Sequence, residues 1–190
     1  MPVGREEFLD GARERFRESG MAGVSEMDIA SEIGMDSETV QSHFPDRTSL
    51  VVAVLLEELG SVSKAAMKAL PQSQLDLQLK HLLKARFGFY VQHKQSSALI
   101  LREVIFSRAG WRETYENMLW RFSVEIVSLF HAAKRRGEIR QDVDEALAAR
   151  ALVSYYVTGV LMGVRGDAFD DEGVCVFVFP LVDCLVASLK

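Results

Sequence analysis

The stretch SEMDIASEIGMDSETVQSHFPDR, residues 25–47, decides the fold. Ser25, followed three residues later by Asp28, is an N-cap signature for a helix of about eight residues that Gly34 ends. A second short helix follows this glycine-bearing turn, and the proline near the end of the stretch stops it, because proline lacks the backbone N–H of a continuing helix. Two short helices joined by such a turn predict a helix-turn-helix unit.

Helical patterns flank this unit on both sides. A first helix is predicted over residues 5–19, where apolar side chains recur at helical spacing: Phe8, Leu9, Ala12 and Phe16. Asp36 or Ser37 is expected to cap the second short helix, and Asp46 is expected to cap a long helix that Pro71 must end.

The rest of the chain keeps the helical period. Two apolar stripes predict core-facing helices, the first with Leu75, Leu79, Leu82, Leu83, Phe87 and Tyr90, and the second with Tyr115, Met118, Leu119, Phe122, Ile126 and Leu129. A break at Gly137 precedes another long helix. The tail is predicted to be helical from its context, with a kink or a late start at Pro180. The predicted fold class is all-α, with about nine helices.

Composition indicates a folded globular protein. A chain of 190 residues, 48% of them hydrophobic, can bury a sizeable core. Its longest apolar run, residues 174–182, is too short for a membrane-spanning helix, and the charged N-terminus lacks the apolar segment of a signal peptide. We therefore expect a cytoplasmic protein. Cys175 and Cys184 match neither a disulfide framework nor a zinc pattern, and are expected to be buried thiols.

The motifs of the common catalytic classes are missing from the sequence. It contains no glycine-rich phosphate loop, no Gly-x-Ser-x-Gly elbow and no His-Glu-x-x-His helix. His81, His93 and His131 have no partners at metal-ligand spacing. We expect no enzymatic activity, no metal site and no cofactor.

Negative charge is concentrated at the front of the chain. Residues 1–50 contain five basic and eleven acidic side chains, whereas the remainder contains 17 basic and 16 acidic ones. Such a domain repels the DNA polyanion unless its arginines gather on the DNA side and its carboxylates face away. The arginines available for this are Arg13, Arg15, Arg17 and Arg47.

Three segments of this region, FLDGARERFRESG, DIASEIGMDSETVQSHF and PDRTSLVVAVL, together resemble the N-terminal signature of the TetR family over residues 5–55. The matching positions are Phe16, Gly20, Ile29, Ala30, Gly34, Ser37, Thr39, His43, Phe44 and Leu50. The resemblance implies a helix-turn-helix DNA-binding domain over residues 1–50. It also implies a helical domain for effector binding and dimerisation over residues 51–190.

In this family the third helix enters the major groove of double-stranded operator DNA. By position, the resemblance implies DNA contacts from Ser25, Ser37, Thr39, Gln41, Ser42, His43 and Arg47. Gln41 and Ser42 are suited to base edges. Better suited to phosphates are Ser25, Thr39, His43 and Arg47. The sequence departs from the family pattern at Glu26 and Glu38, which are acidic, and at Gln41, where a tyrosine is usual. Each departure lowers the expected affinity for DNA.

The second half is rich in large apolar side chains. We expect an apolar or aromatic small-molecule effector to bind among Phe87, Tyr90, Phe106, Met118, Phe122 and Tyr155, while ordinary core packing of the same residues is the alternative. Residues 137–163 resemble the start of the family's penultimate helix. Gly159 and Gly163 fit either a helix seam between two subunits or packing within one chain.

These observations predict a ligand-responsive regulator, expected to act as a repressor, that binds a near-palindromic operator as a homodimer. The alternative is an interaction protein that keeps the fold, has lost DNA binding, and docks its acidic N-terminal domain onto a basic surface of another protein.

Overall fold

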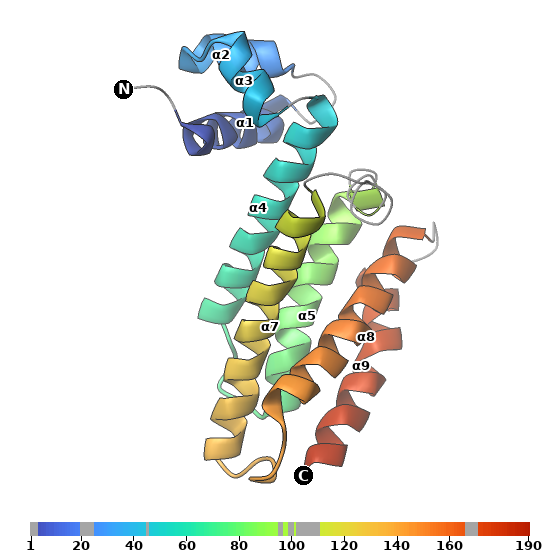
Figure 1. Ribbon diagram of the computed structural model, residues 1–190. Coiled ribbons are helices and arrows are strands. Elements are labelled where there is room, and N and C mark those ends of the chain that lie inside the picture. The colour runs from blue at the N-terminus through green and yellow to red at the C-terminus, as the bar shows by residue number, and fades with distance from the viewer. Residues whose placement is uncertain are drawn as a thin grey trace. The chain divides into compact units, whose positions relative to one another are not determined.

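The computed structural model describes residues 4–19, 25–44, 46–94, 97–98, 101, 111–165 and 171–190. These residues form eight helices and no strand, which confirms the predicted all-α class. The helices, labelled in Figure 1, are α1 (Arg5–Ser19), α2 (Glu26–Ile33), α3 (Ser37–His43), α4 (Arg47–Lys68), α5 (Leu75–Gln92), α7 (Trp111–Arg135), α8 (Glu145–Arg165) and α9 (Asp171–Leu189).

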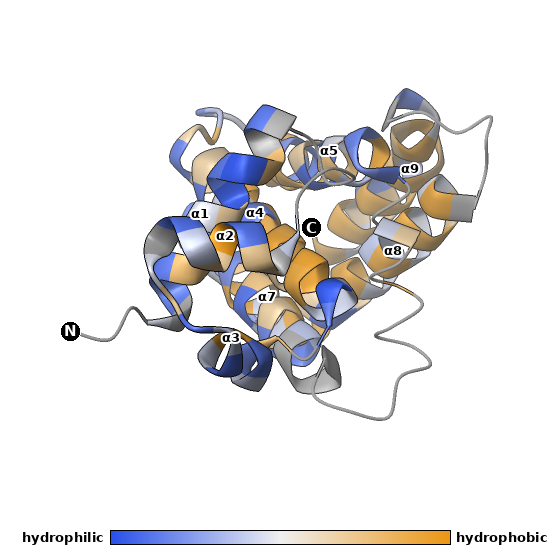
Figure 2. Ribbon diagram, turned by 90° about the horizontal axis from the view of Figure 1, so that it is seen from above, coloured by the Kyte–Doolittle hydropathy of each residue, from blue (hydrophilic) through white to orange (hydrophobic). Residues whose placement is uncertain are grey.

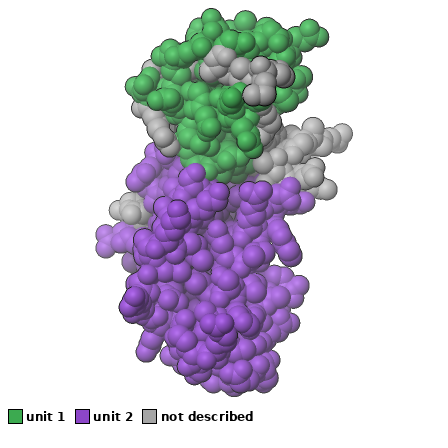
Figure 3. All heavy atoms as spheres, turned by 90° about the vertical axis from the view of Figure 1, so that its left-hand side faces the viewer, with its two compact units in different colours: residues 1–58 green, residues 59–190 purple. Residues whose placement is uncertain are grey.

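The chain divides into two compact units, residues 1–58 and residues 59–190, which Figure 3 colours separately. The boundary falls within α4, and so does the division after residue 50 that was predicted from the sequence. The first unit contains the helix-turn-helix segment, and the second contains the long helices α5, α7, α8 and α9.

The short helices of the first unit have the caps that the sequence predicts. The Asp28 amide donates to Ser25 Oγ at 3.2 Å, and the Ser25 amide donates to Asp28 Oδ2 at 3.3 Å, which completes a capping box. Gly34 ends α2 with φ of +71°, a left-handed conformation that favours glycine. Of the two cap candidates for α3, Asp36 is the cap, and its Oδ1 accepts from the Thr39 amide at 2.8 Å.

A small apolar core holds the three helices of the first unit together. It contains Phe8, Leu9, Ala12 and Phe16 from α1, Ile29 and Ala30 from α2, and Val40 and Phe44 in and after α3. The Phe8 and Phe44 rings stack with centroids 5.3 Å apart. Val40 is the one apolar residue of α3 and is buried, whereas the remaining residues of the helix are polar, and α3 is mostly blue in Figure 2.

In the second unit α5 contacts α7, α8 and α9, and α8 also packs against α7 and α9. Both candidate seam glycines are buried in this packing. A Cβ atom on Gly159 would lie 2.7 Å from Phe87 Cζ and 2.8 Å from Val178 Cγ2, and one on Gly163 would lie 2.9 Å from Val174 Cγ2. The glycine face of α8 therefore packs within the chain, which was the alternative to an intersubunit seam.

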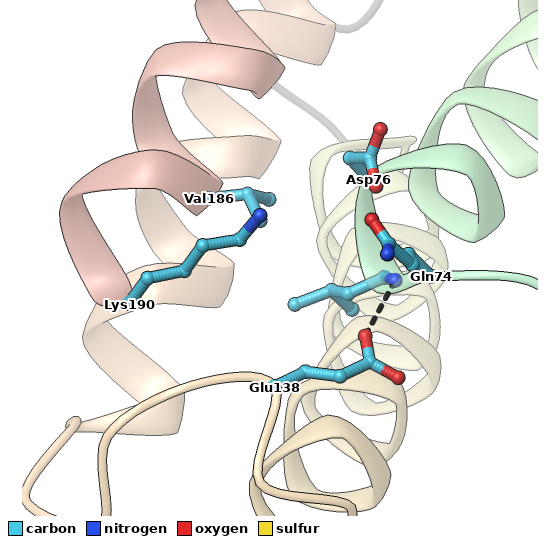
Figure 4. A pocket seen from close by; sticks show the side chains of 6 residues that line it. Gln74, Asp76, Glu138, Val186 and Lys190 are labelled. Carbon is cyan, nitrogen blue, oxygen red and sulfur yellow. Dashed lines mark hydrogen bonds between the residues drawn. The ribbon is translucent and has the colours of Figure 1, made fainter.

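The turn that follows α7 is hydrogen-bonded to the beginning of α5. Gly137, with φ of +74°, ends α7, as the sequence predicts. Glu138 next to it accepts a hydrogen bond from the Leu75 amide at 2.8 Å, so a residue 63 positions later caps the first turn of α5. Figure 4 shows this bond beside a pocket of about 230 Å³.

The tail is helical, as predicted, but α9 begins at Asp171 and contains Pro180 within it, so the alternative of a late start at Pro180 was wrong. The prediction of two buried thiols was correct for Cys175 and wrong for Cys184, which is exposed. Their nine-residue separation places the two side chains on different sides of one helix.

Helices α8 and α9 are largely apolar, as their orange tones in Figure 2 show. By length and composition, Glu145–Val164 and Glu172–Leu189 could each cross a membrane. Only 39% and 28% of these two segments are buried within the chain. Core helices of soluble proteins meet the same criterion. Much of the apolar surface of α8 and α9 is thus left uncovered by the chain itself.

Candidate DNA-binding and effector sites

The exposed face of α3 carries most of the predicted DNA contacts. Gln41, Ser42 and His43 are exposed, and Ser37 and Thr39 are half-buried. Val40, the one buried residue within the helix, anchors it from the opposite side. The predicted contacts on α3 therefore belong to one short helix that its cap and this anchor hold in place.

Several hydroxyl groups of this surface already bond within the unit. Thr39 Oγ1 donates to Asp36 Oδ2 at 2.7 Å, and Ser42 Oγ donates to the Thr39 carbonyl at 2.7 Å. Ser25 Oγ accepts from the Asp28 amide, so its own hydrogen is left for another acceptor. A phosphate bound by Thr39 would have to replace the bond to Asp36, whereas one bound by Ser25 would not.

Carboxylates lie close to the candidate DNA contacts. Glu38 is exposed in the first turn of α3. Asp36 precedes it, and the hydrogen bonds from the Thr39 hydroxyl and amide hold the pKa of Asp36 below its ordinary value. Bonds from Ser25 likewise lower the pKa of Asp28. Asp36 and Asp28 therefore keep their negative charge at neutral pH.

Two of the arginines available to offset the negative charge on the DNA side are paired with acids of the same unit. Arg15 Nε lies 2.6 Å from Glu32 Oε2, and its Nη1 lies 4.0 Å from Glu18. Arg13 contacts Asp10 at 2.9 Å and Glu57 at 3.7 Å. Both guanidinium groups therefore face carboxylates of the first unit, on α1 itself and on neighbouring helices. This pairing leaves less of their positive charge available to DNA phosphates.

Arg47, the predicted basic phosphate contact, is the first residue of α4 and is exposed. Asp46 before it accepts a hydrogen bond from the Ser49 amide at 2.7 Å, which confirms the predicted cap of this helix. A helix N-terminus with its amides turned outward is favourable for phosphate. Arg47 is thus an exposed basic residue at a capped helix start.

Four of the predicted effector residues are in the core of the second unit. Phe87, Tyr90 and Phe122 are fully buried, and Met118 is half-buried. The three rings meet at Tyr156, with centroid distances of 5.8, 6.2 and 4.9 Å respectively.

The two other predicted effector residues do not join this described cluster. Phe106 lies outside the described residues. Tyr155 is half-buried on α8, and because successive helical residues point about 100° apart, it is directed away from the side on which Tyr156 lies. Binding of an effector at these residues remains a prediction.

Sequence reasoning missed the two most connected polar residues of this cluster, Arg86 and Tyr156. Arg86 is only 1% exposed, and its Nη2 donates to Tyr156 Oη at 2.9 Å. The position itself was a signal, because residue 86 follows Leu79 by seven and Leu83 by three and so lies on the apolar stripe of α5. An arginine on such a stripe must be buried.

Two pockets are formed by described residues alone. The pocket in Figure 4 lies where the end of α9 faces the beginning of α5 and is lined by Gln74, Leu75, Asp76, Glu138, Val186 and Lys190. The other, of about 580 Å³, lies between α5 and α9 and is lined by Lys84, Glu172, Cys175, Val176, Phe179, Pro180 and Asp183. Neither contains a predicted effector residue. Within the described part of the chain, no group of His, Cys, Asp or Glu side chains is arranged to hold a metal ion.

A helix-turn-helix in the first unit, followed by the long helices of the second unit, places the chain in the general class of helix-turn-helix proteins. Comparison with known proteins makes this specific. Residues 8–54 match the profile of the bacterial regulatory proteins of the tetR family. The N-terminal domain is therefore a TetR-family domain, as predicted. No curated protein matches the chain.

Solved structures show that the whole chain has the fold of such regulators. FadR of Bacillus halodurans, a fatty acid degradation regulator, superposes with a TM-score of 0.67 at 18% identity, over 98% of this chain and 100% of that one. FadR of Bacillus subtilis, in complex with stearoyl-CoA, gives 0.67 at 16% identity over the same shares. GusR of Salmonella enterica gives 0.61 at 22% identity, over 96% and 95%.

Proposed function

We propose that this chain is a ligand-responsive transcriptional repressor of the cytoplasm, which binds operator DNA as a homodimer. The observation that carries the proposal is the TetR-family match over the very segment where a capped α3 exposes Gln41, Ser42 and His43. Two copies of α3 would enter successive major grooves, and an effector would change their separation and release the DNA.

DNA affinity should depend steeply on salt, because phosphate neutralisation supplies most of it. The test is fluorescence anisotropy with duplexes from the region upstream of the protein's own gene, over a salt series. Arg47→Gln should weaken binding and lower the salt slope by about two, one phosphate in each subunit. Lys68→Gln, at the exposed end of the same helix, is the matched control and should change neither. If neither the upstream duplexes nor random duplex binds at low salt, the proposal fails.

Homodimerisation would cover the apolar surface that α8 and α9 leave open. Leu147 on α8 is 56% exposed, and Val176 and Phe177 on α9 are 69% and 41% exposed. A charge buried in that interface would be costly, so Val176→Glu should produce a monomer in size-exclusion chromatography with light scattering. Val124→Glu, at an exposed valine of α7, is the control that should remain dimeric.

Charge and bonding in the first unit favour one second candidate, an acidic domain that docks onto a basic protein surface. The paired arginines Arg13 and Arg15 and the bonded hydroxyl of Thr39 support it. Glu38→Gln separates the two candidates, because it removes one exposed carboxylate from α3. The substitution should strengthen duplex binding by a repressor and weaken capture of a basic partner in a pull-down from the native cell. Recovery of DNA alone, with no specific protein, removes this candidate.

The effector is proposed to be a small molecule with a large apolar part, bound among the aromatic side chains around Tyr156. Burial of Phe87, Tyr90 and Phe122 around one point supports this location. The complex of the Bacillus subtilis relative with stearoyl-CoA shows that a protein of this fold accommodates a ligand with a long apolar chain. Release of operator duplex in the anisotropy assay on adding such a ligand is the corresponding test.

A further inference from the structure

The core of the second unit encloses a positive charge. Arg86, on α5, is 1% exposed. Its guanidinium donates hydrogen bonds to Ser63 Oγ, to Tyr156 Oη at 2.9 Å and to Met118 Sδ at 3.0 Å. It also lies over two aromatic rings, 4.0 Å from the centroid of Phe122 and 4.8 Å from that of Tyr156. Helices α4, α5, α7 and α8 thus converge on one cation.

All of these partners are neutral. A buried arginine is normally matched by a carboxylate, because moving an ion out of water costs several kcal/mol that neutral dipoles repay only in part. Within the described residues, no ion pair to Arg86 is formed, and its buried Nε–H has no acceptor. The two Nη atoms of Arg86 therefore have neutral partners only, and its Nε–H donor is unused.

The ionisable side chains around Arg86 do not supply the missing negative charge. Burial raises the pKa of Tyr90 and that of Tyr115 above the ordinary value, so both phenols stay neutral at physiological pH. Glu125 on α7 responds to the field of Arg86, which lowers its pKa, but burial has the larger effect and raises it. Its buried Oε2 has no hydrogen-bond partner, and Glu125 is not among the partners of the Arg86 guanidinium, which are Ser63, Met118 and Tyr156.

We propose that Arg86 binds the carboxylate of an apolar effector, with Ser63 and Tyr156 as its neutral neighbours. This inference rests on the proposed function of the second unit as a ligand sensor, and it specifies the chemical class of the ligand. The free Nε–H would donate to one carboxylate oxygen, and the apolar body would lie against the rings of Phe122 and Tyr90. An uncharged ligand of the same shape would leave the cation unmatched.

The same contacts indicate how a bound carboxylate would change the packing of the helices around Arg86. Tyr156 accepts from Arg86 and donates to Tyr90 Oη at 3.0 Å, so the bonds form a chain across α8 and α5. A carboxylate that draws the guanidinium toward itself changes the bonds to Ser63 and Tyr156 together. Ligand occupancy would thereby shift the packing of α4 against α5 and α8.

The test is titration of the purified full-length chain with octanoate and, separately, with 1-octanol, followed by thermal shift and calorimetry in the absence of DNA. Octanoate at about 1 mM should raise the unfolding temperature, and octanol should bind about tenfold more weakly or worse, because it cannot match the charge. Arg86→Met should reduce octanoate affinity about tenfold or more and leave octanol affinity unchanged. Lys84→Met, an exposed lysine two residues earlier on α5, is the matched control and should change neither.

Three outcomes overturn the proposal: no octanoate binding at about 1 mM, equal affinity for octanoate and octanol, or an Arg86→Met chain that binds octanoate like the wild type. If Arg86→Met does not fold, Glu125→Gln in the otherwise unchanged chain decides the matter. Glu125 is not paired with Arg86 but lies within its field, so removing the charge of Glu125 should make the site more attractive to an anion and strengthen octanoate binding. Unchanged or weaker binding contradicts the proposal. Because no DNA is present, failure of operator binding leaves this result unaffected, and the two ideas fail separately.

Discussion

Replacing Gly159 by alanine tests the packing of the second unit most directly. The new methyl group would lie 2.7 Å from Phe87 Cζ, 2.9 Å from Phe87 Cε1 and 2.8 Å from Val178 Cγ2. Both neighbours are fully buried, so neither can move into solvent. Overpacking of this kind costs about 1–3 kcal/mol. Alanine in a helix recovers about 1 kcal/mol through its higher propensity, so the expected net loss is about 1 kcal/mol.

The propensity gain cancels when Gly159→Ala is compared with Gly88→Ala. Gly88 is also in a helix, α5, but a methyl group there would meet nothing within 4 Å. Gly88→Ala should therefore stabilise the chain by about 0.5–1 kcal/mol. The two variants should differ by about 2 kcal/mol, or about 4–8 °C in the unfolding temperature followed by circular dichroism. Equal stability of the two variants would show that α8 does not approach α5 and α9 as closely as described.

Three further predictions concern single side chains or turns. Asp36→Asn should speed amide exchange at Thr39 at neutral pH, because the Thr39 amide loses a charged acceptor. The pKa of Asp36 is lowered in the folded chain, so its stabilising charge is lost only on acidification, and the difference from the wild type should vanish as pH falls below about 3.8. Tyr156→Phe should cost about 1–3 kcal/mol in urea unfolding, since Arg86 loses a buried acceptor. Gly137→Ala should cost about 1 kcal/mol in the same measurement through its positive φ alone, as the added methyl meets no neighbour.

Local chemistry made the fold predictable from the sequence. The capping pair of Ser25 and Asp28, the left-handed Gly34 and the cap at Asp46 all act within three or four residues, so their effect can be deduced without knowing the tertiary structure. Apolar spacing located α5 and α7 for the same reason. The end of α7 at Gly137 follows the same logic.

The sites were less predictable because they depend on residues far apart in sequence. Arg15 pairs with Glu32, which is 17 positions away, and Arg86 meets a tyrosine 70 positions away. Helical periodicity shows that a residue is buried but not which partner it meets, and on α8 it is the ring of Tyr156, next to the predicted Tyr155, that meets the aromatic cluster. The intrachain contacts of Gly159 likewise required α5 and α9 to be placed.

Arg86 also has a consequence for anyone who engineers this protein. Replacing a buried, unmatched ion by an apolar side chain of similar size is often stabilising by about 1–4 kcal/mol. A selection for heat resistance alone would therefore tend to remove this arginine. The selected variants would be more stable but would no longer bind the effector, and a screen run without the effector would not detect this loss.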